Sequence, residues 1–527
     1  MADHDALVLG AGNNGLLVAA YLAKAGLNVC VLEARPFIGG GVTSQEITLP
    51  GFKHDLGATV AMWVDMNPLI KNDELGLVKR YGLKFLPPPE VQEVVIFPGD
   101  RAIIFYRDIE KTCESIAEIS GKDADQFRKF VAYASPSLEP VLRGGNRPPM
   151  PFGNLLSILS ENSKSLESVR TTLMNAVDLV NEWFTSDEMK IAATRWAAQS
   201  RFSPYECGTA DGILLMAPFT TKYGGKPIEG GAGKFTEAVG KCIKDLGGTI
   251  RTASPVKRII LEKGEATGVV LEGGEKVSAR KAIVANLNYK LLFPGMVGEE
   301  NLPAGFVDQV RKLKPQRIQY LTMHMALNEA PKYRGHPDIS RGYQVQPMGT
   351  ADFDEYLDGL TQAYRGHWRT LSPGILCSTL FDPTRAPAAK HTLWVTHQEP
   401  YYLKEGPEHW DAVKPQVVDG IIKTIQSYTT NMGPGNILAE KTFTPLDFAR
   451  WNPAWFEGDP SHLGAYLMQF MGNRPLPGWS GYKTPISRLY MCGPSTHPGT
   501  GLNAGARAPA NVIMKDLGIE FDKVVQS

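Results

Sequence analysis

The fold of this chain is decided by residues 5–41, DALVLGAGNNGLLVAAYLAKAGLNVCVLEARPFIGGG. The run at residues 5–9 is apolar and contains a β-branched side chain, which predicts a buried strand. Residues 16–25 are rich in Ala and Leu and predict a helix, and residues 28–32 predict a second strand. Strand, glycine turn, helix and strand thus follow one another in the order of a dinucleotide-binding unit.

Three glycines between the first strand and the helix have the spacing G-x-G-x-x-G. Gly10 permits the tight turn, Gly12 lets the backbone approach a pyrophosphate, and Gly15 lets the helix pack closely on the strand. Asn13 and Asn14 fall at the start of the helix, where free N–H groups and the positive end of the helix dipole attract phosphates. We therefore expect these five residues to bind the cofactor.

An acidic residue ends the second predicted strand. At this position, the carboxylate of Glu33 can accept hydrogen bonds from the hydroxyl groups of a ribose. In an NAD site such an acid usually closes the motif. Here Ala34 and Arg35 follow, and then a second glycine turn that contains Gly40 and Gly41. A second glycine turn is not part of that motif, and these four residues are expected to extend the cofactor site.

A second glycine-rich motif lies near the C-terminus, within residues 475–518. Residues 489–492 predict a short buried strand, residues 493–501 a loop, and residues 502–517 a helix. A glycine-rich loop at the start of a helix offers main-chain N–H donors to a polarised or anionic group. The motif therefore predicts a second set of donors for a bound ligand.

The two motifs resemble those of FAD-dependent oxidoreductases of the phytoene desaturase-like and amine-oxidase superfamily. The resemblance rests on Glu33 with the glycines that follow it, and on THPGTG at residues 496–501. Two further segments, FTPLDFARWNPAWFEGD (443–459) and MGNRPLPGWSGYKTPI (471–486), resemble the branch that contains pyridine nucleotide-disulfide oxidoreductase domain-containing protein 2.

This resemblance implies that FAD is the cofactor, and it assigns parts of FAD to the motifs. Glu33 would hold the adenosine ribose, the backbone near Val256 would contact the adenine, and the glycine pair would pass the pyrophosphate. Gly41 stands where many members of the superfamily have Arg. The C-terminal loop would face the N1 and C2-carbonyl edge of the isoalloxazine. The residues implied there are Gly493, Gly501, Leu502 and Asn503.

The resemblance also implies an α/β fold with a discontinuous, Rossmann-like FAD-binding domain of the glutathione-reductase type. A mixed α/β substrate domain is inserted into it. The expected FAD-binding domain comprises residues 1–64, 225–292 and 480–527, and the substrate domain comprises residues 65–224 and 293–479. Within the 225–292 segment, a predicted helix precedes a β-meander that returns to the parallel sheet.

Several local predictions concern the rest of the chain. Residues 65–85 have the spacing of an amphipathic helix, residues 93–108 that of a β-hairpin, and residues 153–200 that of several helices. Prolines and glycines predict a loop at residues 144–151. Pro509 falls inside the last predicted helix, which we expect it to kink.

Composition limits the class of protein. A chain of 527 residues is too long for one core and predicts two or three domains. Lys plus Arg number 55, as do Asp plus Glu, so charge gives no reason to expect a nucleic-acid partner. The six cysteines lack C-x-x-C spacing, which predicts a reducing compartment and no metal site. The early first strand and the absence of any apolar run of ~18 residues predict a cytoplasmic location, with at most peripheral membrane contact.

The expected function is hydride transfer from a substrate carbon to flavin N5. The resemblance implies a dehydrogenase or desaturase of a hydrophobic molecule, isoprenoid-like or aromatic. Two alternatives stay open: an amine or alcohol oxidase of the same superfamily, and a non-catalytic binding protein on a scaffold like that of GDP dissociation inhibitors. Oxygen or a quinone would accept the electrons, and a homo-oligomer is compatible with the sequence.

Few residues suggest acid–base chemistry. His497 is the candidate catalytic residue, although a loop between Thr496 and Pro498 could need it for shape alone. His54 and Asp55 are adjacent in an extended segment and point to opposite sides, so we expect no pair between them. An aromatic-rich stretch would line an apolar pocket or pack in the core; its members are Trp451, Trp455, Phe456, Tyr466, Phe470 and Trp479.

Overall fold

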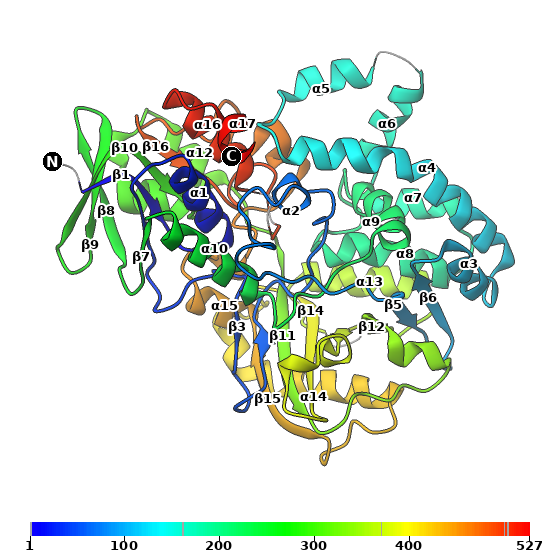
Figure 1. Cartoon of the computed structure of the whole chain (residues 1–527). Helices are drawn as coiled ribbons and strands as arrows, with labels where there is room; N and C mark the ends of the chain where they lie inside the picture. Colours follow the sequence, from blue (N-terminus) through cyan, green and yellow to red (C-terminus); the bar gives the residue numbers. More distant parts are fainter. Residues whose placement is uncertain (1–2, 161–162, 370–371, 500, 503–504, 527) are drawn as a thin grey trace.

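Two seven-stranded sheets organise the molecule (Figure 1). The structure is a computed structural model that describes residues 3–160, 163–369, 372–499, 501–502 and 505–526. The N-terminal and C-terminal segments meet in the first sheet and its helices, while the middle of the chain forms the second sheet and a helical lobe.

The first sheet has the strand order β7-β2-β1-β10-β9-β8, and β16 pairs with β10. The pairs among β7, β2, β1, β10 and β16 are parallel, and β8, β9 and the start of β10 form an antiparallel meander. The strands are β1 (His4–Leu9), β2 (Val29–Leu32), β7 (Thr249–Arg251), β8 (Val256–Glu262), β9 (Glu265–Leu271), β10 (Lys276–Ala285) and β16 (Leu489–Met491).

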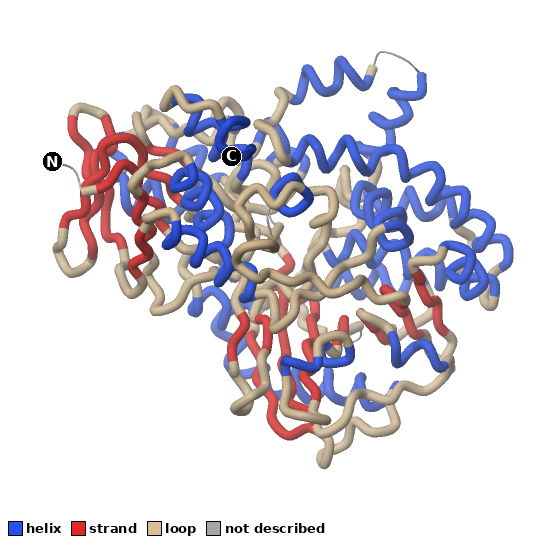
Figure 2. The backbone as a smooth tube through the Cα atoms, viewed as in Figure 1, coloured by secondary structure: helices blue, strands red, loops and turns tan. Residues whose placement is uncertain are grey.

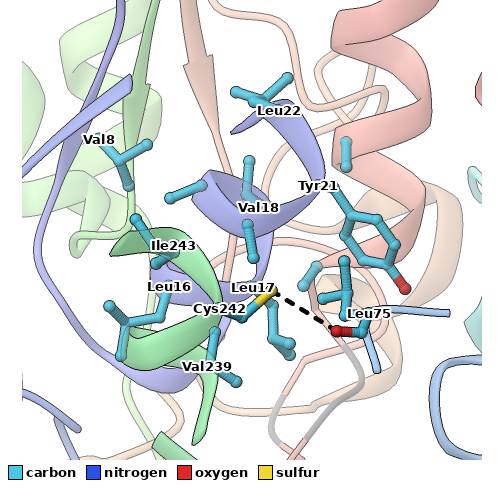
Figure 3. Packing of buried hydrophobic residues seen from close by; sticks show 14 of the residues in the cluster. Val8, Leu16, Leu17, Val18, Tyr21, Leu22, Leu75, Val239, Cys242 and Ile243 are labelled. Carbon is cyan, nitrogen blue, oxygen red and sulfur yellow. Dashed lines mark hydrogen bonds between the residues drawn. The ribbon is translucent and has the colours of Figure 1, made fainter. Parts of the chain in front are cut away.

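Both faces of the parallel part are buried, which explains its nearly continuous apolar sequence. Helices α1 (Asn13–Lys24), α10 (Gly233–Asp245) and α16 (Arg507–Asp516) contribute to the core on one face. Figure 3 shows side chains of α1 and α10 packed together beside Val8 of β1. Leu7, which points to the other side of β1, belongs to a separate core. The predicted fold class is confirmed.

The second sheet has the order β15-β11-β14-β13-β12-β5-β6. Helix α14 (Trp410–Tyr428) covers one face with an apolar stripe that packs against β11 and β14. The strands are β5 (Val91–Ile96), β6 (Ala102–Tyr106), β11 (Ile318–Leu327), β12 (Gln344–Pro347), β13 (Gly374–Leu376), β14 (His391–Pro400) and β15 (Ile437–Phe443). The predicted hairpin at residues 93–108 is β5 and β6.

A helical lobe lies beside β5 and β6 and shares their core (Figure 2). It consists of α3 (Ile109–Ala117), α4 (Gly121–Gly145), α5 (Phe152–Leu159), α6 (Ser163–Leu173), α7 (Ala176–Trp183), α8 (Asp187–Gln199), α9 (Ala210–Lys222) and α13 (Phe353–Tyr364). Short elements complete the chain: α2 (Pro68–Lys71), α11 (Tyr289–Leu291), α12 (Phe306–Lys312), α15 (Pro445–Trp451), α17 (Phe521–Gln526), and a ribbon of β3 (Ser44–Gln45) and β4 (His54–Asp55).

Some local predictions are wrong. Of residues 65–85, only α2 is helical, because Gly76 and Gly82 take positive φ angles of 68° and 73° and turn the chain. Helix α16 begins at Arg507, not at residue 502. Pro509 therefore lies in the first turn, where its missing N–H has no helical acceptor, and it does not interrupt the helix. Helix α4 also continues to the start of the predicted 144–151 loop.

Candidate functional site

A cavity of about 1820 Å³ extends from the carboxyl ends of the first sheet to the helical lobe. Typical ligand pockets measure roughly 300–1,000 Å³, so this one has room for a dinucleotide and a second molecule. The predicted site residues that line it are Gly10, Gly12, Asn13, Asn14, Glu33, Ala34, Arg35, Gly40, Gly41, Val256, His497, Gly501 and Leu502. Gly15 and Gly493 pack behind this lining, and Asn503 lies outside the described residues.

The two glycine turns of the N-terminal unit lie against each other. The main-chain N–H of Gly39 donates to the carbonyl of Ala11 at 2.8 Å, and a Cβ atom on Gly40 would lie 2.8 Å from Cα of Gly12. A side chain on Gly15 would overlap the carbonyl oxygen of Gly10, so only glycine lets α1 start this close to β1. The turns form a narrow cradle of main-chain atoms at the N-terminus of α1.

Glu33 is fixed at the cavity wall by main-chain donors. Its Oε2 accepts from the N–H of Ala11 at 2.7 Å and its Oε1 from the N–H of Arg35 at 3.0 Å. A carboxylate has about four acceptor positions, so two remain for a ligand. The guanidinium of Arg35 lies 3.6 Å from Glu33 Oε1 and 4.3 Å from the ring centroid of Trp451. Burial lowers the pKa of Arg35, an effect that Glu33 partly offsets.

Asn286, which the sequence motifs did not indicate, joins the two glycine-rich motifs. It follows the last residue of β10, and its Nδ2 lies beside both Gly12 and Gly15. A Cβ atom on Gly493 would overlap its Oδ1. Asn286 could not be predicted as a site residue because the sequence around it contains no glycine motif. The pairing of β10 with β1 and β16 brings its side chain to the site.

Side chains of the N-terminal motif also hold the C-terminal motif. Asn13 Nδ2 donates to the carbonyls of Leu502 at 2.6 Å and Gly501 at 3.1 Å. Asn14 Oδ1 accepts from the N–H of Gly505 at 3.1 Å. Their side chains thus connect segments that lie almost five hundred residues apart in the sequence. That both asparagines bind the cofactor at the helix start stays a prediction, and both line the cavity.

His497 lines the cavity, but both of its ring nitrogens are covered. Nε2 lies 3.3 Å from the carbonyl oxygen of Gly144, and Nδ1 is buried without a hydrogen-bond partner in the described part of the chain. Burial lowers the pKa of His497, so the ring is neutral at pH 7. This geometry favours a role in shaping the loop.

The lining of the cavity is mostly apolar in area, although polar side chains such as Thr171 and Gln199 also reach it. Of the aromatic-rich stretch, Trp455, Tyr466 and Phe470 line the cavity, whereas Trp451 stacks on Arg35 and Trp479 packs on Phe306. Phe456, the sixth member of that stretch, is exposed.

Two carboxyl groups, of Glu206 and Asp211, interrupt this apolar lining. Neither side chain forms a hydrogen bond or ion pair with any residue that the structure describes. Burial raises the pKa of each to about 7.

The predicted absence of a His54–Asp55 pair agrees with their contacts. Nε2 of His54 lies 2.7 Å from the hydroxyl of Thr48, and Asp55 pairs with Arg385 at 2.9 Å.

Among the described residues, no group of three or more His, Cys, Asp or Glu side chains is placed to hold a metal ion. No described helix combines the length and apolar character needed to span a bilayer.

A cavity at the carboxyl ends of a parallel sheet, bordered by two glycine turns and a buried carboxylate at the end of β2, is the arrangement typical of dinucleotide-binding enzymes. The family model "Flavin containing amine oxidoreductase" matches residues 15–508, and the chain belongs to that family. The predicted resemblance and the prediction of an oxidoreductase are thereby confirmed.

Three relatives match nearly the whole chain. Pyridine nucleotide-disulfide oxidoreductase domain-containing protein 2 of Rattus norvegicus is 27% identical, over 98% of this chain and 94% of its own length. One of the subunits of limonene dehydrogenase from Castellaniella defragrans is 26% identical (98% and 95% covered), and a lycopene-forming phytoene desaturase of Paracoccus sp. is 23% identical (98% and 98%). Among solved structures, cyclohexylamine oxidase from Brevibacterium oxydans has a TM-score of 0.59 at 15% identity, covering 98% of this chain and 100% of that one.

Proposed function

We propose that this chain binds FAD in the cavity and oxidises a hydrophobic small molecule by transfer of a hydride from a substrate carbon to flavin N5. The observation that carries the proposal is the placement of Glu33. Its carboxylate is held at the cavity wall with two acceptor positions free, directly beside the cradle formed by Gly12 and Gly40. A ribose and a pyrophosphate fit those two features in the order in which a dinucleotide presents them.

Each remaining lining segment has a place in this proposal. Val256 at the start of β8 would contact the adenine, and the loop of residues 493–502 would face the flavin ring. Bound flavin supplies the two-electron chemistry, so the protein has to bind, orient and exclude water. A site with this function does not need a general base, which agrees with the neutral and covered ring of His497 in the C-terminal loop.

A hydrophobic substrate is supported by the cavity wall and by its mouth. Leu155, Leu214 and Phe470 are among the apolar residues that face the cavity. Val141 and Met150 also line it and are 47% and 46% exposed, so apolar side chains reach the surface at its edge, beside the exposed Arg143 and Arg147. Limonene and phytoene, which appear in the names of two relatives, are hydrocarbons that such a surface would accept.

A second candidate function, the oxidation of an amine, is favoured by one specific observation. The carboxyl groups of Glu206 and Asp211 face the cavity without a basic partner in hydrogen-bonding distance among the described residues. An ammonium group on the substrate would supply the missing charge. Alcohol oxidation is supported less well, because neither ring nitrogen of His497 is available as a base.

The test has two steps. The purified protein is first heat-denatured and its supernatant analysed; we expect FAD, and a protein that carries no flavin and takes up none on incubation would refute the proposal. The holoprotein is then mixed anaerobically with terpenes, carotenoid precursors, primary amines and alcohols. Bleaching of the flavin band by a hydrocarbon supports the desaturase assignment, and bleaching by an amine alone supports the second candidate.

A further inference from the structure

Arg474 carries a buried positive charge beside the C-terminal loop. The residue is 1% exposed, and its guanidinium donates only to main-chain carbonyl oxygens. Two of these acceptors, Pro494 and Thr496, belong to the C-terminal loop; their oxygens lie 3.1 and 3.2 Å from Nε. Its other acceptors are the carbonyls of Ser461, Leu463, Gly464 and Gln469.

The charge of Arg474 is not balanced by a carboxylate of its own. Asp459 is the acidic group that acts on it most strongly, but Oδ1 of Asp459 pairs with Arg201 Nη1 at 2.8 Å. Within the described part of the chain, Arg474 forms no ion pair. Burial lowers its pKa to about 10, which still leaves it protonated at neutral pH. Two guanidinium groups therefore share one carboxylate, and one positive charge remains.

The other titratable groups near Arg474 do not cancel this charge. Burial lowers the pKa of His462 to about 4 and also lowers that of His497, and the charge of Arg474 adds to both effects. Burial raises the pKa of the Tyr289 hydroxyl. All three groups are thus neutral at pH 7. A buried charge without a partner is unfavourable, so a site that keeps one is suited to an anion.

Arg474 also faces the space where that anion would form. It lines the cavity together with Pro494, His497 and Gly499, residues of the loop that the proposed function places at the flavin ring. Because Arg474 is 1% exposed, its charge is screened less than that of a surface residue and acts over several ångströms.

We propose that Arg474 is a positioning residue that stabilises the reduced flavin in its anionic form, and this inference rests on the proposed function. When a hydride leaves the substrate carbon, its two electrons and one proton arrive at N5, the substrate is oxidised, and the negative charge stays at the N1 and C2-carbonyl edge. Arg474 acts on that edge through the loop that it holds and through its own charge. It thereby raises the reduction potential of the flavin without contacting the reacting carbon.

The test uses the FAD-loaded protein and its Arg474→Met and Arg474→Lys variants. Sulfite adds to N5 and leaves the same negative charge, so its dissociation constant, read from flavin absorbance, reports on that edge. We expect Arg474→Met to raise this constant by roughly tenfold or more and Arg474→Lys to change it much less.

In the unmodified protein, the midpoint potential should fall by about 30 mV per pH unit above neutral pH, the value for two electrons and one proton.

A buried arginine elsewhere provides the matched control. Arg195 is also 1% exposed and pairs with Glu93, outside the cavity lining. Arg195→Met should lower stability while sulfite affinity stays unchanged. Unchanged sulfite affinity in Arg474→Met with FAD bound would overturn the inference. If that variant does not fold, a potential that falls by about twice 30 mV per pH unit in the unmodified protein overturns it. Absence of FAD from the unmodified protein refutes the proposed function instead.

Discussion

Glu33 Oε2 accepts a hydrogen bond of 2.7 Å from the main-chain N–H of Ala11. This bond joins the end of β2 to the glycine turn that follows β1. It holds the carboxylate in place within the protein itself, because the strands on either side of the bond, β1 and β2, are paired in one sheet. The acid that would bind a ribose is therefore also part of the structure that shapes the phosphate cradle.

The first prediction concerns Glu33→Gln. A glutamine has one acceptor oxygen in place of two, so it cannot keep the bonds from Ala11 and Arg35 and also bind a ribose. We expect FAD affinity to fall about tenfold or more, in line with roughly 1.5–3 kcal/mol for a hydrogen bond to a charged group. Titration of the apoprotein, followed by flavin fluorescence, measures this. Glu275→Gln, at an exposed ion pair with Arg251, should bind FAD normally.

The second prediction compares two glycines. A methyl group at Gly15 would overlap the carbonyl oxygen of Gly10, whereas one at Gly273 would meet no atom within 4 Å. Gly15→Ala should lower the free energy of unfolding by about 1–3 kcal/mol, the usual cost of overpacking, and should weaken FAD binding. Gly273→Ala should do neither. Equal denaturant midpoints for the two variants would contradict the close contact between α1 and β1.

The third prediction concerns His497→Ala. Removal of a general base commonly slows a reaction by ~10²-fold or more. Because Nε2 of His497 is engaged by Gly144 and Nδ1 is covered, we expect a smaller loss in the rate of anaerobic flavin reduction. Stopped-flow measurement with a compound that bleaches the flavin gives that rate. A loss beyond a hundredfold, with FAD still bound, would make His497 a catalytic residue.

The fourth prediction concerns pH and Asp211. Burial raises the pKa of this carboxyl from 3.8 to about 7 in the folded chain. Its ionisation is therefore unfavourable for folding, and the cost accumulates as the pH rises from about 4 to 7. Asp211→Asn removes that cost. It should match the unmodified protein in stability at pH 4 and exceed it by about 2 kcal/mol at pH 8, allowing for the partial exposure of the group to the cavity.

Denaturant unfolding at both pH values measures the effect at Asp211. Asp354→Asn, at an exposed position on α13, is the control and should show no such pH dependence. A variant that is no more stable than the unmodified protein at pH 8 would mean that the Asp211 carboxyl is well solvated in the cavity.

The N-terminal unit could be predicted because its signals are local. Apolar runs, glycine spacing and a terminal acid all fall within residues 5–41, and each has one structural interpretation. The segment at residues 65–85 is predicted to be an amphipathic helix, yet after α2 it folds as turns. Leu75 is buried beside α1 and α10 (Figure 3), and Leu77 belongs to the same core. In this segment, tertiary packing and the positive φ angles of Gly76 and Gly82 determine the backbone conformation, and the apolar pattern of the sequence does not.

The parts of the site that could not be predicted depend on long-range contacts. Asn286 reaches Gly12 and Gly493 because β10 lies between β1 and β16, and strand order is not encoded near residue 286. Arg474 is an arginine in a proline-containing loop, a residue that usually lies at a surface. Its burial follows from six carbonyl oxygens contributed by two separate loops, which no local pattern reveals.

The position of β16 in the first sheet has a consequence for biosynthesis. This strand pairs with β10, and the loop after it is held by Asn13 and Asn14. On the ribosome, β1 and its glycine turn emerge soon before β2 but hundreds of residues before β10 and β16. The edge of β10 that pairs with β16 therefore stays unpaired until residue 491 has been translated. Cofactor loading is then a late event, and a ribosome stalled before that point holds a chain that exposes an apolar strand edge and is a target for chaperones.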